Sequence, residues 1–140
     1  MYIFDTDHIS FIQRNGKEGK HILKRLATLD NPEVAVTIIT YEEQVRGRLL
    51  FLSKSKTIEQ QIFAYQGLEQ LVLDYQSIVV VSFNQIAVLE YQRLRKSYPR
   101  LGNMDLKIAA ITLTNKAVLL TRNGADFRQI SELKIEDWSV

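Results

Sequence analysis

Cysteine is absent from this sequence of 140 residues, and histidine occurs only twice. The lack of cysteine excludes a disulfide framework, a thiolate nucleophile and any zinc site with cysteine ligands. The two histidines, His8 and His21, are too few for a histidine-rich metal site. A metal ion bound by this chain is therefore expected to be a hard cation held by oxygen ligands, such as Mg²⁺ or Mn²⁺.

Long apolar runs are also missing. No segment approaches the roughly 18 consecutive apolar residues that a membrane helix needs. The first residues, MYIFDTDH, have neither the basic region nor the apolar stretch of a signal peptide. We therefore expect a cytoplasmic protein with no membrane-spanning segment. An apolar fraction of 46% suits one globular domain over residues 1–140 with a core of its own.

The sequence also lacks an excess of positive or negative charge. The formal net charge is only +2, from 18 Lys and Arg against 16 Asp and Glu. This balance does not by itself indicate a nucleic-acid-binding protein. Basic residues do form local groups, and the group at residues 93–100 is expected to be a solvated helix face.

Apolar runs suited to strands alternate with helical patterns along the whole chain. The expected strands span residues 2–4, 34–39, 78–81, 117–121 and 133–138, the last of them at an edge of the sheet. Helical patterns lie between them, at residues 9–14, 17–29, 40–51, 57–75, 85–98 and 103–113. This alternation predicts an α/β fold, a three-layer α/β/α sandwich around a mainly parallel sheet. The helices at 40–51 and 57–75 are expected to pair as a helical hairpin.

Capping signals mark the starts of several helices. Thr40 and Glu43 have the spacing of a capping box, which would open the helix after the second strand. Asn84 and Asn103 are expected to cap the helices that follow them. The helix that starts at Asn103 carries apolar side chains over too wide a surface for an exposed helix, so we expect it to be central and buried.

Acidic side chains stand where the expected strands end. Asp5 follows the first strand, Glu43 the second and Asp126 the fourth, while Asp105 opens the helix before the fourth strand. Ligands of open parallel sheets bind outside the carboxyl ends of the strands, so these four carboxylates are expected to meet in one cleft. They would repel one another unless divalent cations lay between them. Metal ions held by carboxylates activate water for phosphodiester cleavage.

Each acid taken alone also has a purely structural explanation. Asp5 suits a turn or a helix cap, and Glu43 a capping box. Asp105 suits the positive end of a helix dipole, and Asp126 suits a turn. Their joint occurrence at strand ends favours a site. Thr6 is a further candidate, because a hydroxyl next to Asp5 can hold a metal-bound water or a phosphate.

Two other residues are expected to be structural. His8 is expected at a helix surface or partly packed. Trp138 is expected to anchor a core or a dimer interface rather than to stack on a base.

Four segments carry a family resemblance: IFDTDHI at 3–9, ITYEE at 39–43, GNMDLKIAA at 102–110 and LTRNGADF at 120–127. In this order they resemble the motifs of PIN-domain nucleases, and among these the VapC-type toxins of bacterial toxin–antitoxin pairs. The resemblance covers essentially the whole chain. No one motif is specific, but four in the right order are hard to obtain by chance.

The resemblance implies a magnesium-dependent endoribonuclease that acts on RNA. It implies an acidic metal site with polar support nearby: Asp5, Glu43, Asp105 and Asp126 as the acids, with Thr121 and Asn123 beside them. It also implies a homodimer and a small antitoxin protein that covers or invades the active site.

The chain departs from the family pattern at two positions. The family commonly has asparagine where Asp7 stands and a small residue where Glu42 stands, so this chain carries extra acids. The spacing to Gly47 favours Glu43 over Glu42 as the glutamate that faces the metal.

Other functions stay open at this point. A phosphoacceptor signalling module also places magnesium-binding acids at parallel strand ends. It needs a lysine at the end of the last central strand, where this chain has Leu120 followed by Thr121-Arg122-Asn123. A PIN-domain RNA-processing nuclease without an antitoxin, or a non-catalytic RNA-binding PIN domain, would share the fold; the presence of all four acids disfavours the latter.

Overall fold

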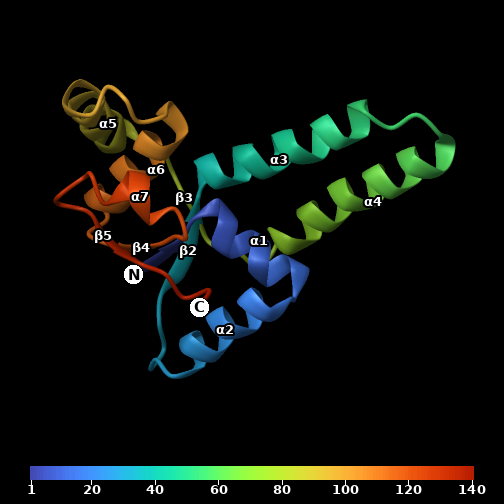
Figure 1. Cartoon of the computed structure of the whole chain (residues 1–140), viewed down its shortest axis with the longest axis horizontal. Coiled ribbons are helices and arrows are strands. Elements are labelled where there is room, and N and C mark those ends of the chain that lie inside the picture. The colour runs from blue at the N-terminus through green and yellow to red at the C-terminus, as the bar shows by residue number, and fades with distance from the viewer.

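A computed structural model describes residues 1–140, and its centre is a sheet of five strands in the order β3-β2-β1-β4-β5. Every pair of neighbouring strands is parallel. The strands are β1 (Tyr2–Phe4), β2 (Val34–Thr37), β3 (Val80–Val81), β4 (Val118–Leu120) and β5 (Lys134–Glu136). The parallel sheet is confirmed, and β5 lies at its edge as expected (Figure 1).

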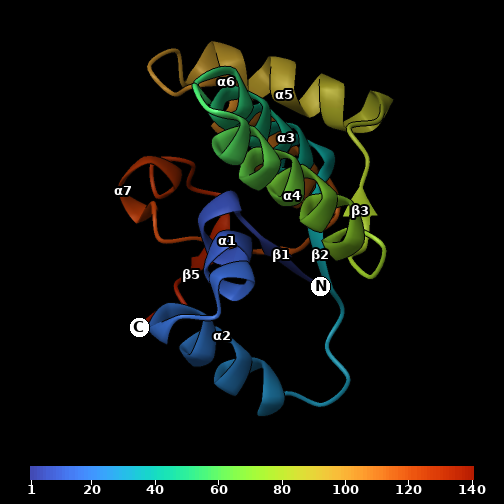
Figure 2. The same cartoon turned by 90° about the vertical axis from the view of Figure 1, so that its right-hand side faces the viewer.

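Seven helices surround this sheet: α1 (Thr6–Arg14), α2 (Lys17–Ala27), α3 (Ile38–Ser53), α4 (Ile58–Asp74), α5 (Gln85–Ser97), α6 (Asn103–Thr114) and α7 (Gly124–Phe127). Figure 2 shows α1 and α2 on one side of the strands, with α5 and α6 on the other. The expected three-layer α/β/α arrangement is therefore confirmed. None of the helices combines the length and the apolar character that crossing a membrane requires.

Alternation along the central strands divides the core between the two faces of the sheet. Ile3 and Leu119 belong to the cluster on the α5–α6 side, whereas Phe4 and Leu120 belong to the cluster with α1 and α2. Successive side chains of a strand point to opposite faces, so strands covered on both faces are apolar at every position. Trp138 is 3% exposed within the second cluster, which confirms its place in the core.

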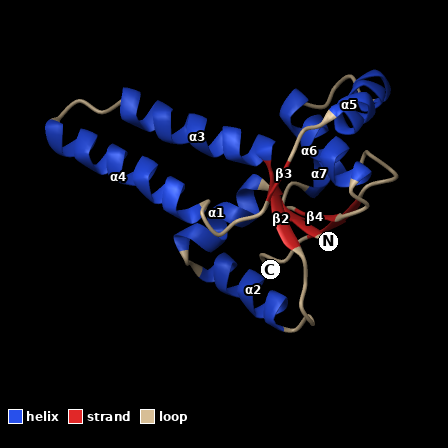
Figure 3. Cartoon of the chain, turned by 180° about the vertical axis from the view of Figure 1, so that it is seen from behind, coloured by secondary structure: helices blue, strands red, loops and turns tan.

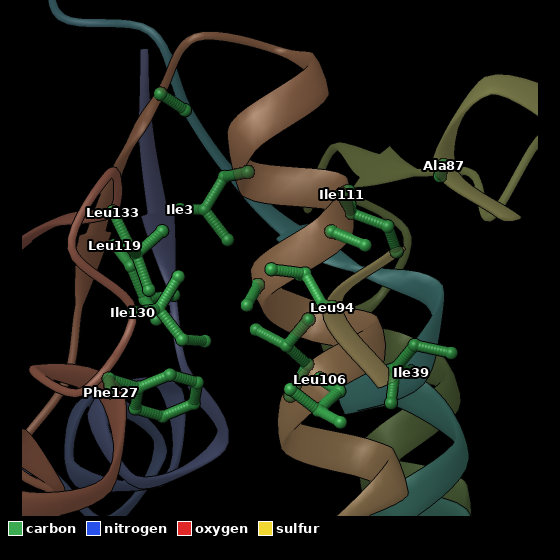
Figure 4. Close-up of a cluster of buried hydrophobic side chains, with 14 of the residues drawn as sticks. Ile3, Ile39, Ala87, Leu94, Leu106, Ile111, Leu119, Phe127, Ile130 and Leu133 are labelled. Carbon is green, nitrogen blue, oxygen red and sulfur yellow. The ribbon is translucent and has the colours of Figure 1, made fainter. Parts of the chain in front are cut away.

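Helix α6 is the buried helix that its sequence predicts. Between Leu106 and Ile111 every apolar residue is fully buried, and only Lys107 is half-buried. Figure 4 shows α6 between the strand side chains Ile3 and Leu119 and the side chain of Ile39 from α3. This packing fixes the start of α6, and with it Asp105, relative to the sheet.

Two capping predictions are wrong: at α3 a neighbouring threonine is the cap, and at α6 the side chain of the expected cap accepts hydrogen bonds from another helix instead. Helix α3 begins at Ile38, because the Thr37 hydroxyl accepts a hydrogen bond from the Thr40 N–H at 3.2 Å. Thr40 therefore lies within the first turn, the expected Thr40–Glu43 capping box does not form, and β2 ends at Thr37 rather than at residue 39. As a consequence Glu43 lies in the second turn of α3.

Helix α6 also starts differently from expectation. Its N-cap is Gly102, which has no side chain to accept a hydrogen bond, and Asn103 is the first helical residue. The Asn103 Oδ1 atom instead accepts hydrogen bonds from the Tyr91 hydroxyl at 3.1 Å and from Arg95 Nη1 at 2.6 Å. The expected cap at Asn84 is confirmed by the bond from the Ala87 N–H at 3.0 Å.

The expected helical hairpin of α3 and α4 is confirmed, and it projects from the body of the molecule (Figures 1 and 3). Near its tip Phe51 and Phe63 meet edge to face, with 5.9 Å between ring centroids. Large apolar side chains of the hairpin remain exposed, among them Leu49, Leu50, Phe51, Ile58, Ile62, Phe63, Tyr65, Val72 and Leu73. A cavity of about 530 Å³ lies between the two helices near Phe51 and Phe63.

Two glycines in these helices give a stability prediction. A Cβ atom on the buried Gly19 of α2 would stand 2.4 Å from the backbone oxygen of Phe11, whereas a Cβ atom on the exposed Gly47 of α3 would meet nothing within 4 Å. We expect Gly19→Ala to lower the free energy of unfolding by about 1–3 kcal/mol through overpacking. Gly47→Ala should raise it by about 0.5–1 kcal/mol, because alanine favours a helix interior. Urea unfolding of the two variants tests this; a Gly19→Ala protein as stable as the parent would contradict it.

Candidate active site

The candidate site lies at the carboxyl ends of the central strands. Asp5 follows β1 directly, and Thr121 follows β4, its neighbour in the sheet. Helix α3 leaves from the end of β2 on the other side of β1 and carries Glu43. The structure thus brings residues from distant parts of the sequence to one edge of the sheet, as parallel topology requires.

Asp5 is the most buried acid of the site, with 7% of its surface exposed. It is the N-cap of α1, where its Oδ1 accepts a hydrogen bond from the Thr6 N–H at 2.7 Å. Its Oδ2 accepts a hydrogen bond from the Thr121 hydroxyl at 2.8 Å. Burial raises the pKa of Asp5 from 3.8 to about 7, and the charges of Asp7 and Asp105 add to the rise.

Glu43, and not Glu42, contacts the residue next to Asp5. The Thr6 hydroxyl donates a hydrogen bond to Glu43 Oε1 at 2.8 Å. Burial raises the pKa of Glu43, and the charge of Asp105 raises it further. Glu42 instead pairs with Arg46 one turn along α3, at 2.5 Å. Thr6 therefore links two of the acids, one through its N–H and the other through its hydroxyl.

Asp105 is half-buried in the first turn of α6, and neither of its carboxylate oxygens accepts a hydrogen bond from the protein. Burial raises the pKa of Asp105, followed by the charges of Asp126 and Asp7. Asp105 in turn raises the pKa of both Asp5 and Glu43. The charge of Asp105 therefore disfavours the ionised forms of Asp5 and Glu43, while its own carboxylate has no hydrogen-bond partner in the protein.

The turn after β4 holds the remaining predicted site residues. The Thr121 hydroxyl, while donating to Asp5, accepts a hydrogen bond from the Asn123 N–H at 3.0 Å. The Asn123 side-chain amide donates to Asp126 Oδ2 at 3.1 Å. Thr121 and Asn123 therefore orient Asp5 and Asp126 respectively, and both acids contribute charge next to Asp105.

Two residues close to Asp5 in sequence make contacts at the edge of the site, and one of them is Asp7, an extra acid relative to the family pattern. Asp7 accepts a hydrogen bond from the Arg122 N–H at 3.1 Å and lies 2.9 Å from the imidazole of His8. His8 is 0% exposed, so the expectation of a surface or partly packed histidine is wrong. Its second ring nitrogen accepts a bond from the Trp138 N–H at 3.0 Å. The order of residues along the chain gives no sign that positions 8 and 138 meet.

The electrostatics of the site are those of an uncompensated acidic cluster. The pKa values of Asp5, Glu43 and Asp105 are all raised, and no lysine or arginine forms an ion pair with any of them. Carboxylate oxygens are the ligands preferred by Mg²⁺ and Mn²⁺. In the side-chain conformations of the structure, however, no three such groups lie close enough together to hold one metal ion. The donors fit a divalent cation by chemistry, and a rotation of one side chain would let three of them share it.

Comparison with known protein families identifies this arrangement. The PIN domain model matches residues 2–133. The chain is 31% identical over 144 residues to Ribonuclease VapC1 of Haemophilus influenzae (strain R2866), with 99% of this chain and 98% of the relative covered. It is 29% identical to the tRNA(fMet)-specific endonuclease VapC of Salmonella typhimurium, with 98% and 97% covered.

Solved structures agree with the sequence comparison. The VapBC-1 structure from nontypeable Haemophilus influenzae superposes with a TM-score of 0.76 at 29% identity, covering 99% of this chain and 98% of the other. The structure of VapBC2 from Rickettsia felis bound to a promoter DNA fragment gives a TM-score of 0.77 at 25% identity, with 98% of each chain covered. A family model that covers four of the five strands, and full-length relatives with the same fold, show that this chain belongs to the PIN-domain family, in its branch of VapC ribonucleases.

Proposed function

We propose that this protein is a magnesium-dependent endoribonuclease, active also with Mn²⁺, that cleaves RNA phosphodiester bonds as the toxin of a toxin–antitoxin pair. The observation that carries the proposal is Asp105, a half-buried carboxylate without a hydrogen-bond partner among other acids of raised pKa. A bound cation would stabilise the ionised form of such a carboxylate. The relatives named as ribonucleases direct the proposal toward RNA.

Asp5, Glu43, Asp105 and Asp126 are the residues that would hold the cation. A divalent ion bound there would lower the pKa of water and neutralise charge on the departing oxygen. Thr6 and Thr121 orient Asp5 through both of its oxygens. Because Glu43 is long and held by a single hydrogen bond from Thr6, rotation of its side chain would let it approach Asp105.

The proton state of Asp5 makes the cation part of the working site. With a pKa of about 7, Asp5 without a cation is protonated in about half of the molecules at neutral pH. A protonated carboxyl is a poor ligand, so binding of the cation and loss of the proton occur together. The protein therefore supplies a site that becomes fully charged only when it is loaded.

Exposed apolar surface supports protein partners for this toxin. The aromatic tip of the α3–α4 hairpin, with Phe51 and Phe63 about half exposed or more, is a surface that a partner protein would cover. Relatives of known structure are named as toxin–antitoxin complexes, so we assign this surface to the antitoxin. Ile86 and Leu89 on α5 are 66% and 61% exposed and support a homodimer. We take residues 1–140 as one nuclease domain that works in the cytoplasm.

The proposal predicts metal-dependent RNA cleavage by the purified chain. A structured RNA pool incubated with the protein should be cut internally in Mg²⁺ or Mn²⁺ and remain intact with EDTA, because the acids alone repel the phosphate backbone. Gel analysis of end-labelled RNA measures this. In cells, expression should arrest growth, and the product of a short reading frame directly upstream should restore it. RNA that stays intact at saturating Mg²⁺ would refute the proposal.

The same preparation separates the phosphoacceptor alternative. Incubation with a small phosphodonor should leave every aspartate unmodified, as intact-protein mass spectrometry would show. A stable acyl phosphate on an aspartate would favour a signalling module. Cleavage of RNA without growth arrest would instead favour an RNA-processing PIN nuclease that has no antitoxin.

A further inference from the structure

A chain of hydrogen bonds connects the C-terminal segment to the turn after β4 through His8 and Asp7. The Trp138 N–H donates to His8 Nε2 at 3.0 Å, and His8 Nδ1 lies 2.9 Å from Asp7 Oδ1. The Arg122 N–H donates to Asp7 Oδ2 at 3.1 Å. Two of these links are made by backbone N–H groups, whose positions are set by the fold rather than by side-chain rotation.

The bonding pattern fixes which nitrogen of His8 carries the proton. A backbone N–H can only donate, so the Nε2 atom facing Trp138 must accept, and the ring proton must reside on Nδ1, where it points at Asp7. Asp137 Oδ1 lies 3.6 Å from Nε2, too far for a hydrogen bond. That oxygen already accepts bonds from the Ser139 N–H at 2.8 Å and the Ser139 hydroxyl at 2.6 Å.

The Trp138 end of this series of hydrogen bonds is held in the core. Trp138 is 3% exposed and lies 4.9 Å from the ring of Tyr2, centroid to centroid. His21 of α2 is 3.1 Å from the backbone oxygen of Ser139. His8 itself is completely buried. The hydrogen bonds through His8 therefore fix Asp7, at the edge of the site, relative to the packed segment around Trp138.

Both oxygens of Asp7 are engaged, and this separates Asp7 from the acids that would bind metal. One oxygen faces the His8 Nδ1–H and the other accepts from Arg122. Only a carboxylate has two acceptor oxygens; an asparagine has one and would turn its NH₂ group toward one of these donors. Asp105, by contrast, has both oxygens free of protein donors.

The residue that Asp7 holds stands between the two supports of the site. Arg122 follows Thr121, whose hydroxyl bonds Asp5, and precedes Asn123, whose amide bonds Asp126. A shift of the Arg122 backbone would displace both supports at once. Groups that orient ligating carboxylates in this way are known to affect metal affinity or activity by roughly tenfold to hundredfold.

We propose that Asp7 and His8 are positioning residues of this nuclease: together they fix the Thr121–Asn123 turn, and with it Asp5 and Asp126, without binding the metal themselves. The proposal rests on the proposed function for its catalytic consequence. Its structural part does not, because the tautomer of His8 and the position of the turn exist whether or not RNA is cut.

The first test measures the tautomer in the parent protein. Long-range ¹H–¹⁵N correlation of ¹⁵N-histidine-labelled protein without metal should show His8 with a protonated Nδ1 and an unprotonated Nε2. A proton on Nε2, alone or together with one on Nδ1, would overturn the chain. The same spectrum contains His21 as an internal comparison.

The second test uses Asp7→Asn, with Asp30→Asn in an exposed turn as the matched control. Asp7→Asn should shift the amide signals of Thr121, Arg122 and Asn123, lower kcat for RNA by roughly tenfold or more, and raise the Mg²⁺ concentration for half-maximal rate by less than Asp105→Asn raises it. Asp30→Asn should match the parent in each measurement.

Two results with Asp7→Asn would overturn the positioning role. One is a parental kcat with unshifted Thr121–Asn123 signals. Loss of Mg²⁺ binding in Asp7→Asn, as complete as in Asp105→Asn, would make Asp7 a ligand and also overturn it. If the parent protein cuts no RNA, the proposed function fails, and the amide shifts together with the His8 tautomer still decide the positioning role.

Discussion

An Asp105→Asn protein is expected to cleave RNA at least on the order of a hundredfold more slowly than the parent while remaining fully folded. The loss follows because the amide cannot serve as an anionic ligand at the one acid without a protein partner. The fold should persist because no hydrogen bond to the Asp105 side chain is broken and its repulsion with Asp126 and Asp7 is removed. Single-turnover cleavage at saturating Mg²⁺ measures the rate, and thermal unfolding measures the fold.

Asp30→Asn provides the control for this variant, because it makes the same chemical change in an exposed turn between α2 and β2. It should cut RNA at the parental rate. A thermal midpoint for Asp105→Asn at or above the parental value would show that lost activity is not lost structure. Parental cleavage by Asp105→Asn would sink the proposed metal site.

The metal-free protein is expected to lose stability as the pH rises from about 4 to about 7, by up to about 4 kcal/mol from Asp5 alone. The pKa of Asp5 is 3.8 in the unfolded chain and about 7 when folded. Between these values the folded protein holds a proton that the unfolded chain has released, so the contribution is complete below pH 3.8 and lost as the pH approaches 7. Glu43 and Asp105, whose pKa values are also raised, act in the same direction.

Other carboxylates titrate in the same range, so the informative quantity is the difference in the free energy of unfolding between the parent and a variant without the Asp5 carboxyl group. Urea unfolding of the parent and of Asp5→Asn, each in EDTA, should show the parent losing stability relative to the variant as the pH rises. Adding Mg²⁺ at pH 8 to about a hundred times its dissociation constant should restore about 2.7 kcal/mol to the parent and less to the variant. A stability difference that stays constant from pH 4 to pH 8 would contradict the raised pKa of Asp5.

The sheet and the location of the acids could be predicted because both follow from short-range patterns. Continuous apolar runs mark strands buried on two faces, and a parallel sheet necessarily gathers the residues that follow such strands. Asp5 and Thr121 end neighbouring strands, and their hydrogen bond joins positions 116 apart in the chain. The strand-end argument placed Asp5 at this edge, and the family resemblance added Thr121.

Helix starts were harder to predict where several capping residues compete. Thr37 and Thr40 are both able to cap α3, and the extended backbone of Thr37, with φ −90° and ψ 159°, decides in its favour. At α6 the side chain of Asn103 is drawn to Tyr91 and Arg95, which belong to another helix. Such tertiary partners override local preference, and they leave no local pattern in the sequence.

The roles of Asp7 and His8 could not be predicted for a related reason. The Trp138 N–H that sets the His8 tautomer lies 130 positions away along the chain. No periodicity or motif connects a histidine in the first helix to a backbone group beyond the last strand. The extra acid at Asp7 was visible as a departure from the family, but only its two hydrogen bonds explain it.

The strand order has a consequence for how the nuclease comes into being during synthesis. The first strand made, β1, pairs with β4, whose residues leave the ribosome more than a hundred positions later. Until then Asp5 lacks its bond from Thr121, and the emerging chain has no Asp126. Such distant pairings form late in folding. A nascent chain that carries only β1, β2 and α3 therefore holds half of the acids but no working site, so the ribosome that makes this protein is not exposed to an active nuclease while the first hundred residues are being translated.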